Sequence, residues 1–422
     1  MFRAVVVVSL AFLAACPSQT PAPVPPRPQP VEPVGPVEPV DPVGPVDPHG
    51  PVDPVGPVDP GGPVEPGSPA PPPQITWQRV VRADDVSSAA PPPDTWRVHM
   101  IDVGTGLAIF VEGADFSLLF DAGTSDPGEQ PLRMVAYLAA VLGRSGDDEC
   151  SETGTASKTR LPIDHVVLSH PHQDHASALA LVLHCFDVRN VWDSGRLVDT
   201  AFYRDLMRAI AHATGASYHT AAEPPKDRAV TIKGDTLTIP PTVAWPSFRE
   251  GDRVVLGERA SFTILHAEAK RHPDPNQNSI VIAVALGDAR LLLTGDAESG
   301  PRQEPSAPLG DVEAHLVDHF ARLIDVDILQ VGHHGSETSS RRAFLDAVSP
   351  SLALVSAGPK LFGHVRLPDD SVIAALAATG ATILRTDVHD RACPLADRLG
   401  PNTGPGGCDS YVITIVSPPP AP

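Results

Sequence analysis

The sequence predicts an α/β fold in which two packed mixed sheets carry helices on their outer faces. Short apolar runs separated by turn residues open the globular part and are typical of antiparallel strands. Later strand-like runs come in groups with helical patterns between them, an order that favours two sheets with helices outside. The strands are expected at 98–102, 107–112, 117–121, 163–168, 261–265, 279–286, 290–294, 328–331, 352–356 and 411–416, and the helices at 131–142, 176–184, 201–214, 312–323 and 370–378.

Helices and strands are predicted from different spacings of their apolar residues. In 131–142 the apolar residues recur every three or four positions, which is the spacing of one helix face. The run 163–168 is continuously apolar apart from Asp164 and His165, as in a buried strand, and it leads directly into His170.

Proline marks where the globular part begins. The chain has 422 residues and 50 prolines, well above the ordinary share of about 5%. Between residues 30 and 66 a proline stands at every third position, which matches the three-residue turn of polyproline II. We therefore expect a disordered Pro-rich linker at 17–75 and one globular domain at 76–422.

The first 16 residues resemble a bacterial lipoprotein signal. Arg3 precedes an apolar run, and the segment ends Leu13-Ala14-Ala15-Cys16. This predicts lipidation of Cys16 and an exported protein anchored to membrane lipid in the cell envelope, on its periplasmic or cell-surface face. An ordinary signal peptide with an incidental cysteine is the alternative. No apolar run reaches the roughly 18–20 residues that span a bilayer.

The other four cysteines suit an exported protein, because an even number predicts disulfides. Cys393 and Cys408 flank a Pro/Gly-rich loop and are expected to pair, which leaves Cys150 and Cys185 as the second pair. A catalytic thiol is disfavoured because none of the four has a suggestive histidine partner.

The chemistry-bearing cluster follows the strand at 163–168. The segment Ser169-His170-Pro171-His172-Gln173-Asp174-His175 brings four metal-ligating side chains within six residues. His170 and His172 are two apart and can hold one metal, while Asp174 and His175 begin a helix and can hold a second. Imidazole and carboxylate together suit zinc, iron or manganese.

Further polar side chains are delivered at strand ends. Asp296 follows an apolar strand and a glycine, and His333 and His334 follow another apolar strand. One of the two histidines is expected to bind the second metal, and His333 is preferred. Asp102 is expected beneath the site, where it would hydrogen-bond a ligand histidine and fix its tautomer.

The HxHxDH pattern and several other segments resemble the metallo-β-lactamase superfamily, in particular the hydrolase domain of the ComEC competence-protein family. No segment resembles that family's membrane channel. The matching segments keep their order from 98 to 387: 101–106 (IDVGTG), 120–123 (FDAG), 293–296 (LTGD), 330–336 (QVGHHGS), 356–364 and 385–387 (RTD).

The resemblance implies an αββα sandwich that binds two divalent metal ions, zinc or manganese. It implies that Asp296 bridges the metals, and it makes His364 a candidate for substrate contact or proton donation, although Val365 replaces the family's proline. Where many superfamily members place a third histidine, this chain and the competence family have Asn276, expected to support the first site. His266 and His272 are nearby alternatives.

These residues predict a metal-dependent hydrolase in which Asp174 or Asp296 orients an activated water. The resemblance favours a small-molecule or nucleic-acid phosphodiester as substrate for a monomeric enzyme. Lactone, β-lactam or thioester hydrolysis is the alternative, and a metal-stabilised surface binding protein without turnover is another. The net charge of −20 excludes a generally basic nucleic-acid-coating protein. Three arginines could offset that charge locally: Arg196, Arg341 and Arg342.

Overall fold

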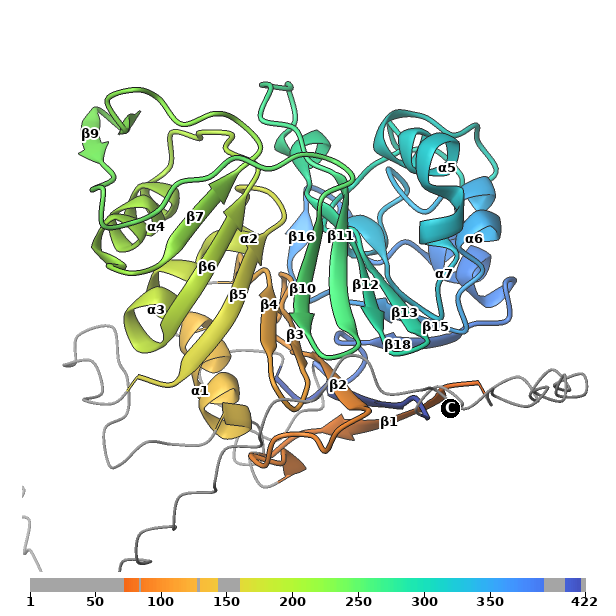
Figure 1. Cartoon of the computed structure of the whole chain (residues 1–422). Coiled ribbons are helices and arrows are strands. Elements are labelled where there is room, and N and C mark those ends of the chain that lie inside the picture. Colours follow the sequence, from red (N-terminus) through yellow and green to blue (C-terminus); the bar gives the residue numbers. More distant parts are fainter. Residues whose placement is uncertain (1–71, 83–84, 127–129, 143–159, 391–406, 419–422) are drawn as a thin grey trace, which may run out of the picture. The chain divides into compact units, whose positions relative to one another are not determined.

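Two mixed sheets pack face to face and helices cover the outer face of each, which confirms the predicted αββα sandwich (Figure 1). The computed structural model describes residues 72–82, 85–126, 130–142, 160–390 and 407–418. The expected signal at 1–16 and nearly all of the expected linker lie outside these ranges. The first strand starts at Gln74, so the fold begins two residues before the expected boundary.

The first sheet changes from antiparallel to parallel along its width. Its order is β1-β19-β2-β3-β4-β5-β6-β7, antiparallel as far as β4 and parallel from there. The strands are β1 (Gln74–Val80), β19 (Ser410–Val416), β2 (Thr95–Met100), β3 (Ile109–Glu112), β4 (Ser117–Phe120), β5 (Pro162–Leu168), β6 (Asp187–Asp193) and β7 (Ser217–Thr220).

The second sheet has the same mixed character. Its order is β10-β11-β12-β13-β14-β15-β18, antiparallel as far as β13 and parallel beyond it. The strands are β10 (Arg253–Gly257), β11 (Ala260–His266), β12 (Val281–Leu286), β13 (Ala289–Leu293), β14 (Ile328–Gln330), β15 (Leu352–Val355) and β18 (Thr382–Arg385).

Helices α1, α3 and α4 lie on the outer side of the first sheet, and α5, α6 and α7 on that of the second (Figure 1). The helix expected at 176–184 is replaced by two short ones, α2 and α3. The helices are α1 (Gln130–Leu142), α2 (Gln173–Ala176), α3 (Leu179–Cys185), α4 (Ala201–His212), α5 (Asp311–Ile324), α6 (Arg342–Val348) and α7 (Asp370–Ala377). The smaller elements are the hairpins β8–β9 (Ala229–Ile232, Asp235–Thr238) and β16–β17 (Leu361–Phe362, Val365–Arg366) and the 3₁₀ turns η2 (Pro275–Asn278) and η3 (Gly332–Gly335).

Alternate residues of the central strands face different cores, which fixes the register. In β3, Ile109 and Val111 join the core between the sheets, while Phe110 joins the core beneath the helices. β12 does the same on the other sheet, where Ile282 faces inward and Val281 faces the helices. A slip of one residue would exchange these faces, and each large apolar side chain lost from a core costs roughly 1.5–3 kcal/mol. The strand ends that carry polar residues are therefore held in place.

The cysteine pairing stays a prediction. Cys185 and Cys408 are buried and are not free thiols. Their expected partners, Cys150 and Cys393, lie outside the described residues, as does Cys16. Among the helices that the structure describes, none combines the length and apolarity of a membrane span.

Candidate metal centre

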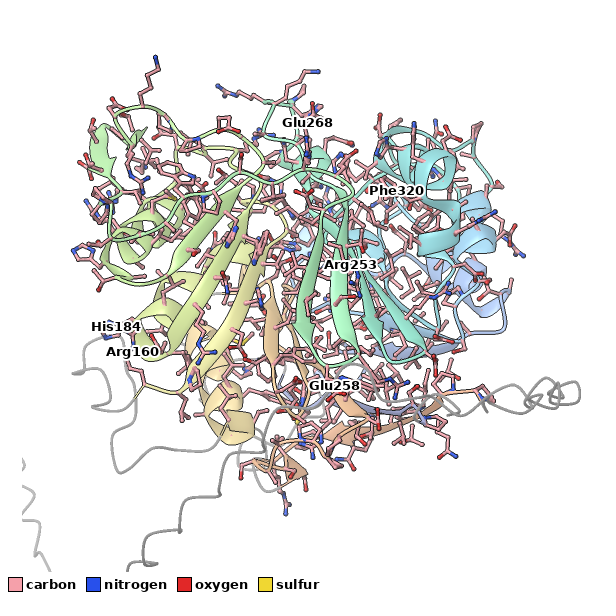
Figure 2. The ribbon with its side chains drawn as sticks, viewed as in Figure 1. Arg160, His184, Arg253, Glu258, Glu268 and Phe320 are labelled. Atoms are coloured by element: carbon pink, nitrogen blue, oxygen red, sulfur yellow. The ribbon has the colours of Figure 1, made fainter. Side chains whose placement is uncertain are left out.

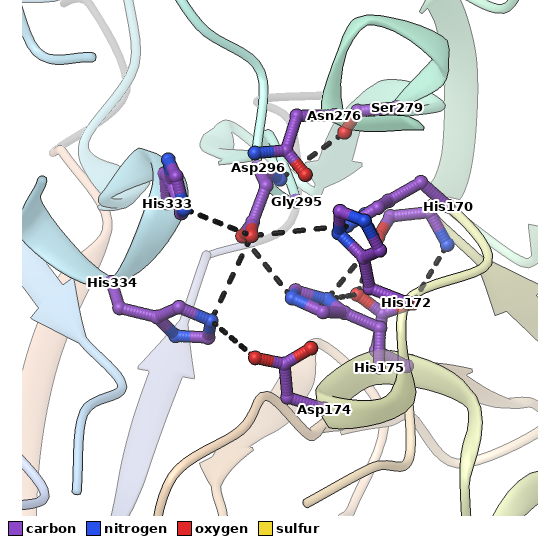
Figure 3. Close-up of polar contacts among 12 residues, drawn as sticks. His170, His172, Asp174, His175, Asn276, Ser279, Gly295, Asp296, His333 and His334 are labelled. Carbon is purple, nitrogen blue, oxygen red and sulfur yellow. Dashed lines mark hydrogen bonds and ion pairs between the residues drawn. The ribbon is translucent and has the colours of Figure 1, made fainter. Parts of the chain in front are cut away.

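The candidate ligands come from strand ends of both sheets and meet in one place (Figure 3). His170 stands two residues after β5 of the first sheet. Asp296 follows β13 and His334 follows β14, two parallel neighbours in the second sheet. The sandwich thus brings together segments that are more than 100 residues apart in the chain.

The turn at α2 sets the directions of the consecutive ligands. The carbonyl oxygen of His172 accepts the backbone N–H groups of His175 and Ala176 at 3.2 and 3.0 Å, which starts the helix immediately after the second histidine. This turn packs directly on the turn after β4. A Cβ added to Gly123 would lie 2.4 Å from the backbone nitrogen of His175, so only glycine permits the approach.

Asp121, which follows β4, orients His175. Its Oδ2 accepts from Nδ1 of His175 at 2.7 Å and from the hydroxyl of Ser169 at 2.6 Å, and its Oδ1 accepts the backbone N–H of Ser169 at 2.7 Å. Because the proton of His175 is held on Nδ1, the lone pair of Nε2 faces the centre. The sequence placed Asp121 in a turn motif but gave it no role. The parallel pairing of β4 with β5 is the signal that could have found it, since Phe120 lies opposite Val167.

The expectation that Asp102 holds a ligand histidine is therefore wrong. Oδ1 of Asp102 accepts the backbone N–H of Gly104 at 3.0 Å, and Oδ2 accepts those of Gly407 and Asp409 at 2.6 and 3.0 Å. The carboxylate is buried, and it ties the loop after β2 to the segment that leads into β19. Its role is structural because the chain after β2 turns toward β19 rather than toward the histidines.

Asp296 occupies the middle of the centre. Its carboxylate is 2% exposed, with Oδ1 3.2 Å from Nε2 of His175 and Oδ2 3.8 Å from Nε2 of His170 and 3.7 Å from Nε2 of His334. Gln330 holds the preceding turn, because its side-chain oxygen accepts the backbone N–H groups at 294 and 295 at 2.7 and 2.8 Å. One carboxylate thus lies within reach of cations on both sides.

His334, and not His333, joins the ligand group. Both adopt left-handed backbone angles, with φ of 55° and 46°, and this strained turn lets both rings face Asp296 (Figure 3). Nε2 of His333 lies 3.8 Å from Oδ2 of Asp296, but His333 belongs to neither group of converging ligand atoms. Nδ1 of His334 donates to the carbonyl oxygen of Ser356 at 2.8 Å, which leaves Nε2 facing Asp174 at 3.8 Å. His333 is 23% exposed at its side chain, and its Nδ1 lies 2.9 Å from Oε1 of Glu298. The preference for His333 is corrected for this reason.

The ligand atoms form two overlapping triads. His170, His175 and Asp296 make one, and Asp174, His175 and His334 make the other, with the ligand atoms of each triad within 4.8 Å of one another. His172 flanks the first triad, with its Nδ1 2.9 Å from Nε2 of His170. Buried polar atoms here make no hydrogen bond among the described residues, which fits atoms reserved for a cation. They are Nε2 of His175, Oδ1 of Asp296, Nε2 of His334 and Oδ1 of Asn276.

The pKa values of the candidate ligands also fit a cation-binding site. Burial, reinforced by the neighbouring His175, holds the pKa of His170 well below its usual range, and burial also lowers that of His172, so both rings offer free lone pairs at neutral pH. Burial opposes the charge of Asp296, yet the histidines around it, His175 first, hold its pKa well below the usual range. The centre therefore presents a carboxylate and, at His170 and His172, neutral imidazoles, which suit a divalent cation such as zinc. Although burial opposes the charge of His175, Asp296 and Asp121 hold its pKa well above the usual range.

Asn276 lies in η2 above Asp296 (Figure 3). Its Nδ2 donates to Oε1 of Glu298 at 3.2 Å, and its buried Oδ1 makes no hydrogen bond among the described residues. The nearby alternatives are engaged elsewhere, since Nδ1 of His266 bonds the carbonyl of Ser279 at 2.7 Å and His272 pairs with Glu268. Of the three residues, Asn276 is the one placed beside the ligands.

Other residues singled out in the sequence lie away from the triads. His364 stands in the exposed turn between β16 and β17, and its side chain makes no hydrogen bond or ion pair with the described residues. Arg341 is buried beside α6, where its guanidinium donates to backbone carbonyls, including that of Pro301 at 2.7 Å. Arg342 pairs with Asp346 at 2.7 Å on the surface. The expectation that these two arginines offset charge for a substrate is corrected by their partners.

Comparison with known families agrees with this geometry. The model of the metallo-beta-lactamase superfamily matches residues 101–358, more than half of the chain. The chain belongs to this superfamily. The match includes all the candidate ligands, from His170 to His334.

Similar proteins include competence proteins. The chain is 26% identical over 305 residues to competence protein ComA of Neisseria gonorrhoeae and 25% identical over 294 residues to ComE operon protein 3 of Bacillus subtilis. These matches cover 71% and 69% of this chain and 32% of each relative, so the chain spans about a third of their length. Among solved structures, the metallo-beta-lactamase fold protein YhfI of Bacillus subtilis is 12% identical over 69% of this chain and 97% of that one, with a TM-score of 0.37.

Fold, ligand set and family together support a metal-dependent hydrolase.

Proposed function

We propose that this protein is a metal-dependent phosphodiesterase that uses two divalent cations, zinc or manganese, with DNA among its candidate substrates. The observation that carries the proposal is the position of Asp296, whose Oδ2 lies 3.8 Å from Nε2 of His170 in the first triad and 3.7 Å from Nε2 of His334 in the second. Two cations a few ångströms apart are the arrangement that stabilises both the attacking and the leaving oxygen in phosphoryl transfer. The similarity to competence proteins supports a polyanionic substrate.

In this proposal His170 and His172 would hold one cation, and Asp174, His175 and His334 would hold the other. Asp296 would contribute to both, and Oδ1 of Asn276, which makes no hydrogen bond among the described residues, would support the first. Bound cations would supply a water of lowered pKa and would stabilise negative charge on phosphoryl oxygens.

Side chains of the protein would orient the attacking water and supply the proton for the leaving oxygen. The side chain of Asp174 is 14% exposed, so its carboxylate can accept a hydrogen bond from the attacking water and orient it. His333 faces the same space, and although burial opposes its charge, Asp296 and Glu298 raise its pKa. It can therefore hold a proton on Nε2 for the leaving oxygen. His364 stays a proposed substrate contact on the exposed hairpin.

The test is hydrolysis of bis-p-nitrophenyl phosphate by the full-length chain, reconstituted with zinc and separately with manganese. Asp174→Ala should lower kcat by at least about 10²-fold, because it removes an acid–base group and a ligand together. Asp346→Ala is the matched control, since Asp346 is an exposed acid on α6 that pairs only with Arg342.

A metal-loaded wild type that does not cleave this substrate would refute the phosphodiesterase proposal. Lactone, thioester and β-lactam panels would then test the other hydrolase classes. A protein that binds metal but is inactive on every panel would instead be a metal-stabilised binding protein. Export and lipid anchoring through Cys16 are proposed on the sequence alone.

A further inference from the structure

Arg196 lies at the same sheet edge as the metal ligands. β5 and β6 are parallel neighbours, and their last residues, Leu168 and Asp193, are opposite each other. The chain after β5 continues to His170, and the chain after β6 continues to Arg196. The turn after β6 is held in place, because the buried carboxylate of Asp193 accepts hydrogen bonds from the hydroxyls of Tyr203 and Tyr218 at 2.6 and 2.9 Å.

The guanidinium of Arg196 is buried and only partly satisfied. The residue is 6% exposed, and its Nη1 donates to Oδ1 of Asn278 at 2.5 Å. Its Nε is buried without a hydrogen-bond partner, and no carboxylate of the described residues forms an ion pair with it. Asn278 belongs to η2, the same turn that places Asn276 beside the centre. The turn η2 thus connects the arginine to Asn276, the residue beside the ligands.

Within the part of the chain that the structure describes, no carboxylate lies close enough to form an ion pair with Arg196. Burial lowers the pKa of Arg196, Arg271 lowers it further, and Asp274 opposes them only in part. The side-chain amide of Asn278 is held in one orientation, because its Nδ2 donates to the backbone carbonyls of Glu268 and Lys270 at 2.5 and 2.7 Å. Asn278 therefore offers Arg196 one neutral acceptor and no negative charge. Figure 2 shows Glu268 in the loop beyond β11.

A buried arginine is rarely left in this state, since buried charges are normally paired. Arg341 gives the contrast within the same chain. Its guanidinium is buried, and its two terminal nitrogens donate to the carbonyls of Pro301, Gln303, Glu304 and Glu337. Its Nε, like that of Arg196, makes no hydrogen bond among the described residues, so the contrast lies in the terminal nitrogens. Arg196 has one amide oxygen and an unused Nε at the border of a candidate active site.

We infer that Arg196 is an anion-binding residue that contacts a phosphate oxygen of the substrate beside the metal centre. A phosphate oxygen would supply the missing counter-charge and an acceptor for the guanidinium, and guanidinium is the side chain best matched to phosphate. This inference rests on the proposed phosphodiesterase function, and it explains how a chain of net charge −20 can hold a polyanion at one point.

The experiment measures binding of inorganic phosphate to the full-length chain by isothermal titration calorimetry, after EDTA treatment and again with zinc. Arg196→Gln should weaken binding by at least about tenfold in the EDTA-treated protein, because it removes a charge-assisted contact. Arg253→Gln is the matched control. Arg253 is an exposed residue of the edge strand β10, labelled in Figure 2, and its loss should leave phosphate binding unchanged.

Asn278→Asp provides a second variant in case Arg196→Gln does not fold. It places a carboxylate against Nη1 of Arg196, which would neutralise the positive charge, and it should weaken phosphate binding to a similar degree. In the zinc-loaded enzyme, Arg196→Gln should raise KM for bis-p-nitrophenyl phosphate more than it lowers kcat.

Phosphate binding by wild type that survives in the folded variants would overturn the inference, and so would a wild type that binds no phosphate in either form. Either of these two results can be told apart from a failure of the proposed phosphodiesterase function. If wild type binds phosphate through Arg196 but cleaves no phosphodiester, the anion site stands and the proposed reaction falls.

Discussion

Replacing Asp121 with Asn should weaken binding of a divalent cation at the candidate centre by about 10- to 100-fold, the usual effect of losing a residue that orients a metal ligand. Asp121 accepts three hydrogen bonds, one from His175 and two from Ser169. An amide keeps one accepting oxygen and replaces the other by a donor. Donation to Nδ1 of His175 would move the ring proton to Nε2, the atom that faces the cation.

The expected size follows from these contacts. A hydrogen bond to a charged group contributes about 1.5–3 kcal/mol. The part that acts through His175 is one such bond, and a 10- to 100-fold change in affinity corresponds to about 1.4–2.7 kcal/mol. The two contacts to Ser169 should appear mainly as a lower free energy of unfolding.

The assay is competition with a chromogenic chelator for zinc and for manganese. Asp102→Asn is the matched control, because it removes an equally buried carboxylate that accepts three backbone N–H groups and does not contact a metal-ligand histidine among the described residues. Asp102→Asn should lower thermal stability and leave metal affinity unchanged. If Asp121→Asn binds metal as tightly as wild type, or if Asp102→Asn is the weaker binder, the assignment of Asp121 is refuted.

Three further outcomes are expected. His334→Ala should lose about one equivalent of bound metal by elemental analysis and His333→Ala should keep both, and the reverse result would restore His333 as the ligand. Burial lowers the pKa of His165 to about 4, and its Nδ1 accepts from Trp192, so the unfolding free energy should fall by up to about 3 kcal/mol as pH drops from 6.5 to 4. His165→Gln should flatten that slope in urea titrations, and an unchanged slope would contradict the cause. Cys16→Ser should abolish a lipid mass increment and membrane-fraction recovery in cells, and unchanged fractionation would refute lipid anchoring.

Contiguous ligands were the part of the site that the sequence could predict. From His170 to His175 the spacing itself determines the geometry, since one strand end and one helical turn place all four side chains. Asp296 was predictable for a similar reason, because it ends an apolar strand. The layers of the fold followed from apolar periodicity, which the three cores of the structure confirm.

The wrong predictions concern side chains whose contacts depend on a backbone angle or on a residue distant in sequence. His333 and His334 are adjacent and both face Asp296, and only the approach of Asp174 to His334 places that ring in a triad. Asp102 and Asp121 both follow strands, and only the pairing of β4 with β5 distinguishes the one beside His175. Helical spacing was a weaker guide at 176–184, where the chain forms two short helices.

The division of the ligands between the two sheets has a consequence for unfolding. A cation held by α2 on one side and by the turns after β13 and β14 on the other is a cross-link through the interior, and neither sheet can separate without releasing it. At a free metal concentration of about 1,000 times Kd, this linkage adds roughly 4 kcal/mol to the unfolding free energy. The metal-loaded protein should therefore melt as one cooperative unit, whereas chelation should let the halves of the sandwich exchange their amide hydrogens at separate rates.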